Sequence, residues 1–541
     1  NGSSNPADTI QEFSTPPTGK SVGGAAIDAP AGAQTATVTI NGVQQTPVNI
    51  TTFAQNPIEV SASSIGLYVN TSGKDYTNSI NGLGNLTQEA DLIIGTEATE
   101  LTNSKSIVIT DPKILNPYNN AIRTSGVSDW NIYSGGLTWL ATPTLNPADG
   151  TMTSIYMVKI PYTAWAGNED LPTAPEDTFN FLDGLEQRYG VEELGIRERE
   201  LFQKLNSIGN NESVLFYQAV DEMMGHQYGN VQQRINETGE VLDKEFNYLR
   251  HDWRNPSKQN NKIKLFGQRN EFRTNTAGII DYDSNAYGVA YLHEDETVKM
   301  GNSQGWYAGY VNNRFRLKDI GKSKETQNIL KAGIFKTMSP AADHNGSLRW
   351  TIGGDVFIGQ NEMERKFLVV DDIFEAKANY TSYGAALKTD LSYDMRLSER
   401  THLRPYGALK MEYGRFNKIK EDDGQVRLEI NGNDYFSVKP EVGVEFKYVQ
   451  PLAVRTQLSA GLTAAYETEL GKVNDVDNQG RVRYTSADWF GIRGEKENRK
   501  GNGKFDLNIG VDNTRFGVTV NAGYDTKGDN IRGGIGFRAI Y

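Results

Sequence analysis

The sequence predicts a mainly β chain: a twelve-stranded antiparallel transmembrane β-barrel, preceded by a helical segment and by the end of a β-solenoid. Apolar and polar residues alternate with period two in twelve segments between residue 262 and the C-terminus, and the links between these segments alternate between short and long. The 55 glycines and 10% aromatic residues suit many turns and an interfacial aromatic belt. No apolar run reaches about 18 residues, which excludes a transmembrane helix but leaves half-polar strands open.

The composition excludes several classes of function. The net charge of −12 gives no support to nucleic-acid binding, for which a basic domain is expected. The chain has no cysteine, which excludes disulfide frameworks, Cys-ligated zinc and thiol nucleophiles. Its five histidines lack metal-binding spacing, and neither a G-x-S-x-G elbow nor a P-loop is present. We therefore expect no metal, no cofactor and no catalytic residue, and predict that the chain is not an enzyme.

Residues 1–172 are predicted to be the C-terminal end of the β-solenoid. Short β-branched runs recur there at spacings of about 15 to 25 residues, separated by Gly, Asn, Ser and Thr. They occupy residues 35–40, 65–69, 90–94 and 106–109. An ordinary β-sandwich or a poorly ordered tail is the alternative.

Two helical regions are predicted next. Residues 173–228 form a helical junction, in which Pro175 and two acidic residues open a run with apolar residues at spacings of three and four. Residues 229–251 form a helix that is polar nearly all round, with too little apolar face to pack on an ordinary core. At about 1.5 Å per residue, residues 229–250 of this helix span about 33 Å, enough to cross a hydrocarbon layer of about 30 Å.

Residues 262–541 are predicted to form the barrel. The last three segments, 505–511, 515–525 and 531–541, have one face without charge and another with glycine and charged residues, as strands between lipid and water do. Short links near 398–400, 450–451 and 512–514 alternate with long, charged links near 360–373, 417–434 and 472–500; the short link at 526–530 is an exception. A soluble sandwich explains the period but not the loop lengths.

A twelve-stranded barrel is wide enough for one helix, which is about 10 Å across. We therefore expect polar side chains of the 229–251 helix to meet arginines on the lumen wall. The helix residues are Gln232, Gln233, Arg234, Glu237, Glu240, Asp243, Lys244 and Glu245; the wall residues are Arg314, Arg316, Arg349, Arg404, Arg532 and Arg538. The alternative is an exposed helix held by its own i,i+4 pairs. Inward carboxylates are expected to belong to a solvated charge lattice rather than to an acid–base pair; they include Asp506, Asp525, Glu441 and Glu445.

The chain end is predicted to be an assembly signal. Ile535, Phe537, Ala539 and Tyr541 share one face of the last segment. This strand must pair with the first one, near residues 263–272, because an open strand edge in lipid leaves backbone groups unsatisfied.

The order of these regions resembles a known family. A β-solenoid end, a helical region containing 215–226, a polar helix and a barrel closing on 537–541 resemble monomeric autotransporters, the type Va secretion proteins. The Asn- and Lys-containing composition is similar to that of the large fusobacterial autotransporter adhesins. The resemblance implies a monomer in the bacterial outer membrane, in contact with lipid and lipopolysaccharide and inserted by the barrel assembly machinery.

The resemblance also implies that the N-terminal passenger is exported to the cell surface and binds host or bacterial surface ligands as an adhesin. Some family members cut the passenger loose between two asparagines inside the lumen helix. Here Asn210 and Asn211 lie between helical segments, so the passenger is expected to stay attached. The alternatives are a free-standing outer-membrane enzyme and a porin, and a porin would not need residues 173–251.

Overall fold

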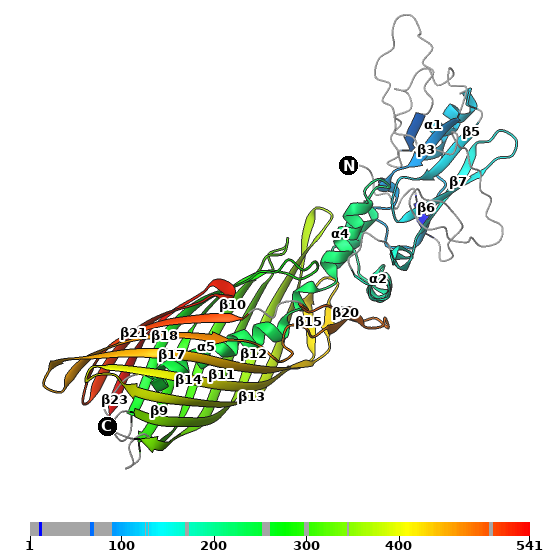
Figure 1. The fold of residues 1–541 in the computed structure, drawn as a ribbon. Helices are drawn as coiled ribbons and strands as arrows, with labels where there is room; N and C mark the ends of the chain where they lie inside the picture. Colours follow the sequence, from blue (N-terminus) through cyan, green and yellow to red (C-terminus); the bar gives the residue numbers. More distant parts are fainter. Residues whose placement is uncertain are drawn as a thin grey trace, which may run out of the picture.

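The computed structural model describes residues 10–12, 65–69, 89–124, 126–127, 129–167, 173–251, 260–296, 302–342, 346–496 and 501–540. A barrel and a smaller N-terminal unit lie at opposite ends of the molecule, with helices between them (Figure 1). The predicted run at 35–40 lies outside the described residues. No helix within these ranges is long and apolar enough to cross a membrane.

Twelve antiparallel strands form the barrel, as the period-two pattern predicts. Each barrel strand pairs with the barrel strands before and after it in the chain, and the last strand pairs with the first to close the ring. The strands are β8 Asn260–Phe272, β9 Tyr282–Glu296, β10 Ser303–Leu317, β11 Lys324–Ala342, β12 Gly346–Val369, β13 Asp372–Arg396, β14 Thr401–Phe416, β17 Asn433–Ala453, β18 Thr456–Glu467, β21 Asn502–Asn513, β22 Phe516–Asp525 and β23 Asn530–Ile540.

The prediction of a long loop at residues 360–373 is wrong. Strands β12 and β13 have 24 and 25 residues, and they meet at a two-residue turn in which Val370 has φ 61°. The charged residues of this segment therefore alternate along strands that continue past the rest of the barrel. Their antiparallel pairing keeps the backbone satisfied beyond the membrane.

The two other long links also contain strands. They are β15 Ile419–Gly424, β16 Leu428–Ile430, β19 Asn478–Val482 and β20 Phe490–Ile492. These strands extend the sheet from β13 in the order β15, β16, β19, β20. We call these four strands, together with the β12–β13 hairpin tip (residues 363–378), the collar.

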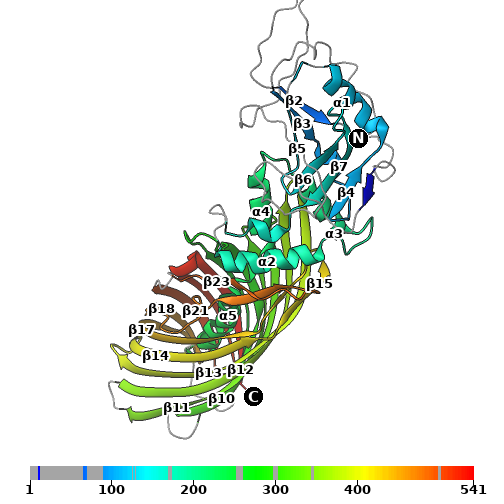
Figure 2. The same cartoon turned by 90° about the vertical axis from the view of Figure 1, so that its right-hand side faces the viewer.

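Four α-helices occupy the region of helical periodicity. They are α2 Pro175–Arg188, α3 Arg197–Asn206, α4 Ser213–Met223 and α5 Val231–His251. The turn after α4 uses Gly225 with φ 80°, where a Cβ atom would also lie only 2.7 Å from Leu428 of the collar. Helix α2 lies across the collar end of the barrel, while α5 lies inside the ring of strands (Figure 2).

In its described residues, the N-terminal unit contains two small sheets and one α-helix. A parallel sheet holds β2 Ile65–Val69, β3 Glu89–Ile94 and β5 Asp129–Ser134, so two of the predicted runs lie side by side in parallel, as in stacked coils. The run at 106–109 instead joins an antiparallel sheet. That sheet has the order β1 Ile10–Glu12, β4 Ser106–Ile109, β7 Met152–Lys159, β6 Trp139–Leu145, and the helix is α1 Pro112–Thr124.

Candidate functional site

Helix α5 fills the barrel lumen along its length. It has 21 residues, of which 14 are buried, and the buried residues lie on every side of the helix. Isolated in water, such a helix would have only a narrow apolar stripe to bury. Inside the barrel its polar side chains meet polar groups of the strands, so the predicted polar surround is the lumen wall itself.

Asp243 is at the centre of the most highly charged contact. Its carboxylate lies 3.0 Å from the Lys331 ammonium and 2.5 Å from that of Lys388, and it also pairs with Lys410. These lysines come from β11, β13 and β14, so one helix residue ties three strands together. Because Lys331 is fully buried, the opposite charge of Asp243 offsets much of the cost of removing that ammonium from water.

Further ion pairs surround the rest of the helix, and in them the helix supplies either the anion or the cation. Helix carboxylates meet wall lysines, and helix cations meet wall carboxylates. The pairs are Glu240–Lys439, Glu245–Lys264 at 2.6 Å, Lys244–Asp525 at 2.7 Å and Arg234–Glu325 at 3.2 Å. Hydrogen bonds add Gln232–Asn478 at 2.7 Å and Gln233–Tyr282 at 3.0 Å, and Gln233 also donates to Glu237 at 3.0 Å. Because these partners are distributed around the ring, α5 is held from all sides.

The predicted wall arginines do not bind the helix carboxylates. Arg532 donates to the Tyr248 hydroxyl of α5 at 2.6 Å, but its ion pairs are with wall carboxylates. Arg404 pairs with Glu445 at 3.1 Å, and Arg538 pairs with Asp512. Arg349 is exposed near the lumen end away from the collar. Lysines take the expected role, because their single charge on a long flexible stem reaches the helix from several strands.

Arg314 and Arg316 were predicted on the wrong face. Both are exposed on the outside of β10, whereas Val311, Phe315 and Leu317 are buried inside. Near the collar end part of the interior is apolar, where Phe315 and Leu317 cluster with aromatic side chains of β8 and β9. The polar face of β10 must therefore turn outward there.

An apolar stripe on α5 complements one side of the lumen. Phe246 packs on Tyr307 of β10, with ring centroids 4.4 Å apart. A Cβ atom at Gly309 would lie 2.7 Å from the Leu242 side chain, so glycine permits the close approach of helix and strand. The sequence shows this stripe only as Leu242, Phe246 and Leu249 at spacings of four and three.

Two cavities remain beside the helix. One of about 170 Å³ lies near its C-terminal half and is bordered by Asp243, Tyr248 and Arg404. Another, of about 460 Å³, lies near Glu237 and Lys439. Both are lined by charged groups and are large enough for several waters at about 30 Å³ each. Within the described residues, no group of three or more His, Asp or Glu side chains is arranged to hold a metal.

A buried ion pair in the collar was not anticipated. The fully buried Arg365 makes a two-pronged contact with Glu421, with N–O distances of 2.9 and 2.8 Å, and donates to the carbonyl oxygen of Met223 at 3.2 Å. The Tyr228 hydroxyl donates to the same carboxylate at 3.0 Å. The pair thereby fastens the chain between α4 and α5 to strands β12 and β15. Its only sequence signal is a charged residue inside a segment expected to be a loop.

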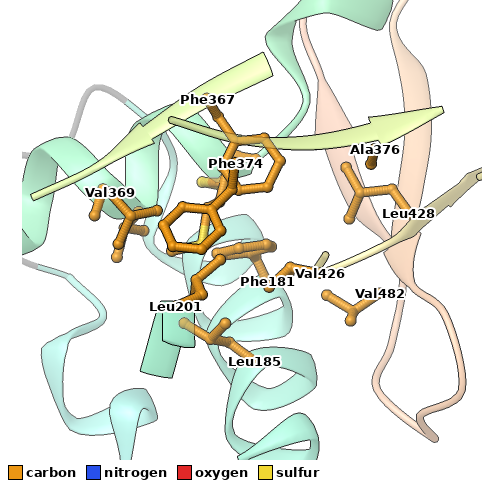
Figure 3. Packing of buried hydrophobic residues seen from close by; sticks show 14 of the residues in the cluster. Phe181, Leu185, Leu201, Phe367, Val369, Phe374, Ala376, Val426, Leu428 and Val482 are labelled. Atoms are coloured by element: carbon orange, nitrogen blue, oxygen red, sulfur yellow. The ribbon is translucent and has the colours of Figure 1, made fainter. Parts of the chain in front are cut away.

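An apolar core joins the collar to helices α2 and α3 (Figure 3). Phe181 meets Phe490 edge to face with centroids 5.6 Å apart, and a Cβ atom at Gly184 would lie 2.6 Å from that of Val482. The buried side chains of this core include Phe181, Leu185, Leu201, Phe367, Val369, Phe374, Ala376, Val426, Leu428 and Val482. The junction helices therefore pack on the barrel as tightly as parts of one domain.

Helix α2 is also fixed to the N-terminal unit. Buried Lys159 of β7 pairs with Glu186 of α2, and its ammonium lies 3.4 Å from the centre of the Tyr162 ring. Burial lowers the pKa of Lys159 to about 8 despite the nearby carboxylate. Burial alone would raise the pKa of Glu186, but the charges of Lys159 and Lys105 lower it overall.

The last strand closes the ring as expected from its pattern. Phe537 pairs with Ile263 of β8, and the pairing continues from Ile531 to Ile540. Ile535 and Phe537 are exposed on the outer face, and Arg538 points into the lumen. Tyr541 lies outside the described residues, and a role of this segment in assembly remains a prediction.

Comparisons with known proteins match the barrel region of the chain. A family model described as the autotransporter beta-domain matches residues 262–523. Similar solved structures include the translocator domain of autotransporter NalP from Neisseria meningitidis, with 12% identity, 57% of this chain and 96% of that chain covered, and a TM-score of 0.41. The transport unit of autotransporter AIDA-I from Escherichia coli has 13% identity, 56% and 99% coverage, and a TM-score of 0.41. No curated protein matches the sequence.

Proposed function

We propose that this chain, whose C-terminal barrel is an autotransporter beta-domain of the bacterial outer membrane, exports its own N-terminal part through the barrel and anchors it at the cell surface. One observation carries the proposal. Helix α5 passes through the lumen from the end that carries the N-terminal unit. Strand β8 follows it in sequence, and the first residue of β8 pairs with Ile540, beside the C-terminus that Figure 1 marks at the other end. A chain threaded in this way has its N-terminal part on the side opposite to the barrel's own termini.

The same threading suggests a role for each region. We assign residues 1–172 to the end of the passenger, 173–228 to the junction, 229–251 to the linker helix and 262–541 to the translocator. The ion pairs of α5 support retention of the helix in the lumen, since its release would separate Asp243 from its lysine partners. The collar supports attachment outside the membrane, because Arg365 and Glu421 bind the chain where it leaves the lumen.

The partners follow from this placement. We propose that the barrel assembly machinery inserts the chain and that the last strand is the segment it engages. The ring closes with the chain's own strands, which supports a monomer. Asn210 and Asn211 lie outside α5, which supports a passenger that stays attached. A passenger held in this way suits adhesion to host or bacterial surface ligands.

The contents of the lumen favour neither of the two alternatives, a porin or a free-standing outer-membrane enzyme. A porin would need an open channel, and α5 occupies it. An enzyme would need a free acid, base or nucleophile, whereas the inward carboxylates singled out from the sequence are paired: Asp506 and Asp525 with Arg532, Glu441 with Lys504, and Glu445 with Arg404. These contacts support a charge lattice.

Surface labelling tests the proposal. An epitope tag inserted after Gly150, in the turn between β6 and β7, should be labelled by antibody on intact cells. A chain with the same tag but without residues 537–541 should lose the labelling, because the ring then lacks its closing strand. Labelling of the first chain only after the outer membrane is permeabilised would overturn the proposal.

A further inference from the structure

The outward side of the β10–β11 hairpin carries three positive charges that form no ion pair within the described residues. Arg314, Arg316 and Lys324 are exposed on the face turned away from the lumen. The strand register places Arg316 directly opposite Lys324, and Arg314 lies two residues away on the same face. In the described part of the chain, no carboxylate lies within ion-pair distance of these three cations.

The acidic residues directly opposite Arg316 and Lys324 on the flanking strands already have partners. Asp283, opposite Arg316 on β9, pairs with Arg273 at 2.5 Å and with Lys318 at 3.4 Å. On β12, Glu364 is opposite Lys324 but pairs with Lys366 at 2.9 Å. Like charges placed directly opposite each other in a sheet repel, so the hairpin has a local excess of positive charge that an anion would relieve.

The height of this cluster indicates what kind of anion it meets. Below it on the outward face come first the polar residues Thr326, Asn312 and Asn328, and then the apolar or aromatic residues Trp306, Tyr310, Leu330 and Ile334. Ten residues separate Gln304 from Arg314, which at about 3.3 Å each and a tilt of about 40° corresponds to about 25 Å along the barrel axis. Arg314 also lies 5.9 Å from the ring of Tyr287, an aromatic residue of the kind found at membrane interfaces. The three cations therefore lie just beyond the collar-side edge of the apolar band, separated from it by the polar pair Asn312 and Asn328.

We propose that Arg314, Arg316 and Lys324 bind the phosphate groups of lipopolysaccharide in the outer leaflet. Guanidinium groups present a planar pair of donors that matches phosphate, and the lysine adds a third charge beside them. The proposal rests on the orientation given above, in which the collar faces the cell exterior. It specifies where the expected contact with lipopolysaccharide occurs.

Binding of diphosphoryl lipid A to the purified full chain in detergent tests the site. The variant Arg314→Gln/Arg316→Gln/Lys324→Gln keeps polar, exposed side chains and should fold with an unchanged unfolding midpoint when lipid is absent. We expect its affinity for lipid A to fall at least tenfold, and the lipid-induced rise in unfolding midpoint to disappear. Lipid A lacking both phosphates should produce no rise in the original chain.

A matched control carries the same loss of charge at the opposite rim. The variant Arg396→Gln/Arg400→Gln/Arg455→Gln also replaces exposed arginines and should bind lipid A like the original chain. The proposal is overturned if the hairpin variant binds normally, if the control variant loses as much affinity, or if dephosphorylated lipid binds equally well. An equal rise in midpoint with inorganic phosphate would also overturn it, because the site would then take free phosphate. Surface labelling of the hairpin variant should stay normal, which separates failure here from failure of passenger display.

Discussion

Replacing Asp243 by asparagine should loosen the helix in the lumen. The variant removes the carboxylate shared by Lys331, Lys388 and Lys410 and leaves an amide of nearly the same size. Removing one partner of a buried ion pair costs about 3–5 kcal/mol. The lysines keep other partners, because Lys331 and Lys410 each lie 3.5 Å from Glu412 and Lys388 lies 2.7 Å from Asp355. We therefore expect a loss of about 3 kcal/mol in the seating of α5.

This loss predicts a measurable change in channel behaviour. Since about 1.4 kcal/mol corresponds to a factor of ten, the fraction of barrels with a displaced helix should rise about 150-fold. Single-channel recording in planar bilayers should show correspondingly more frequent openings. The exposed helix residue Asn247 offers a control, and Asn247→Ala should leave the opening frequency unchanged.

A second substitution separates lost attraction from general damage. Lys331→Met removes one of the lysines that Asp243→Asn leaves without its carboxylate. The double variant should therefore open less often than Asp243→Asn alone, since one buried unpaired charge is gone. Equal opening frequencies for Asp243→Asn and Asn247→Ala would refute the reasoning, because the Asp243 contacts would then not hold the helix.

Three further outcomes are expected. Deleting residues 1–251 should raise single-channel conductance, while Arg314→Glu in the full chain should leave it unchanged, because Arg314 faces outward. Arg365→Met should strand buried Glu421 at a cost of about 3–5 kcal/mol and increase proteolysis at residues 207–212, and adding Glu421→Gln should reverse part of this effect. Since the folded-state pKa of Lys159, about 8, lies below its ordinary 10.5, the unfolded chain binds more protons between these values. Thermal unfolding of the N-terminal unit should therefore shift upward between pH 7 and pH 9.5, and Lys159→Met should remove that shift.

The sequence by itself determined the parts that depend on local periodicity. The twelve strands and the helices between residues 175 and 223 follow from periods of two and 3.6 residues, because these periods reflect which side chains share a face. The need for a polar surround followed from the charge distribution around the helix at 231–251, and the lumen supplies it. The closing pair of strands followed from the cost of an open edge in lipid.

Only the tertiary structure decided which face points inward and which charges meet. Period two groups Arg314 with Arg316 but does not say on which side of the barrel they lie. The apolar core around Phe315 decides that, and it exists only once the barrel has closed over its helix. Asp243 meets Lys331, 88 residues away, and Arg365 meets Glu421, 56 residues away, through closure of the ring and folding of the collar. No local pattern records such distances, because the position of each partner depends on the path of every strand between them.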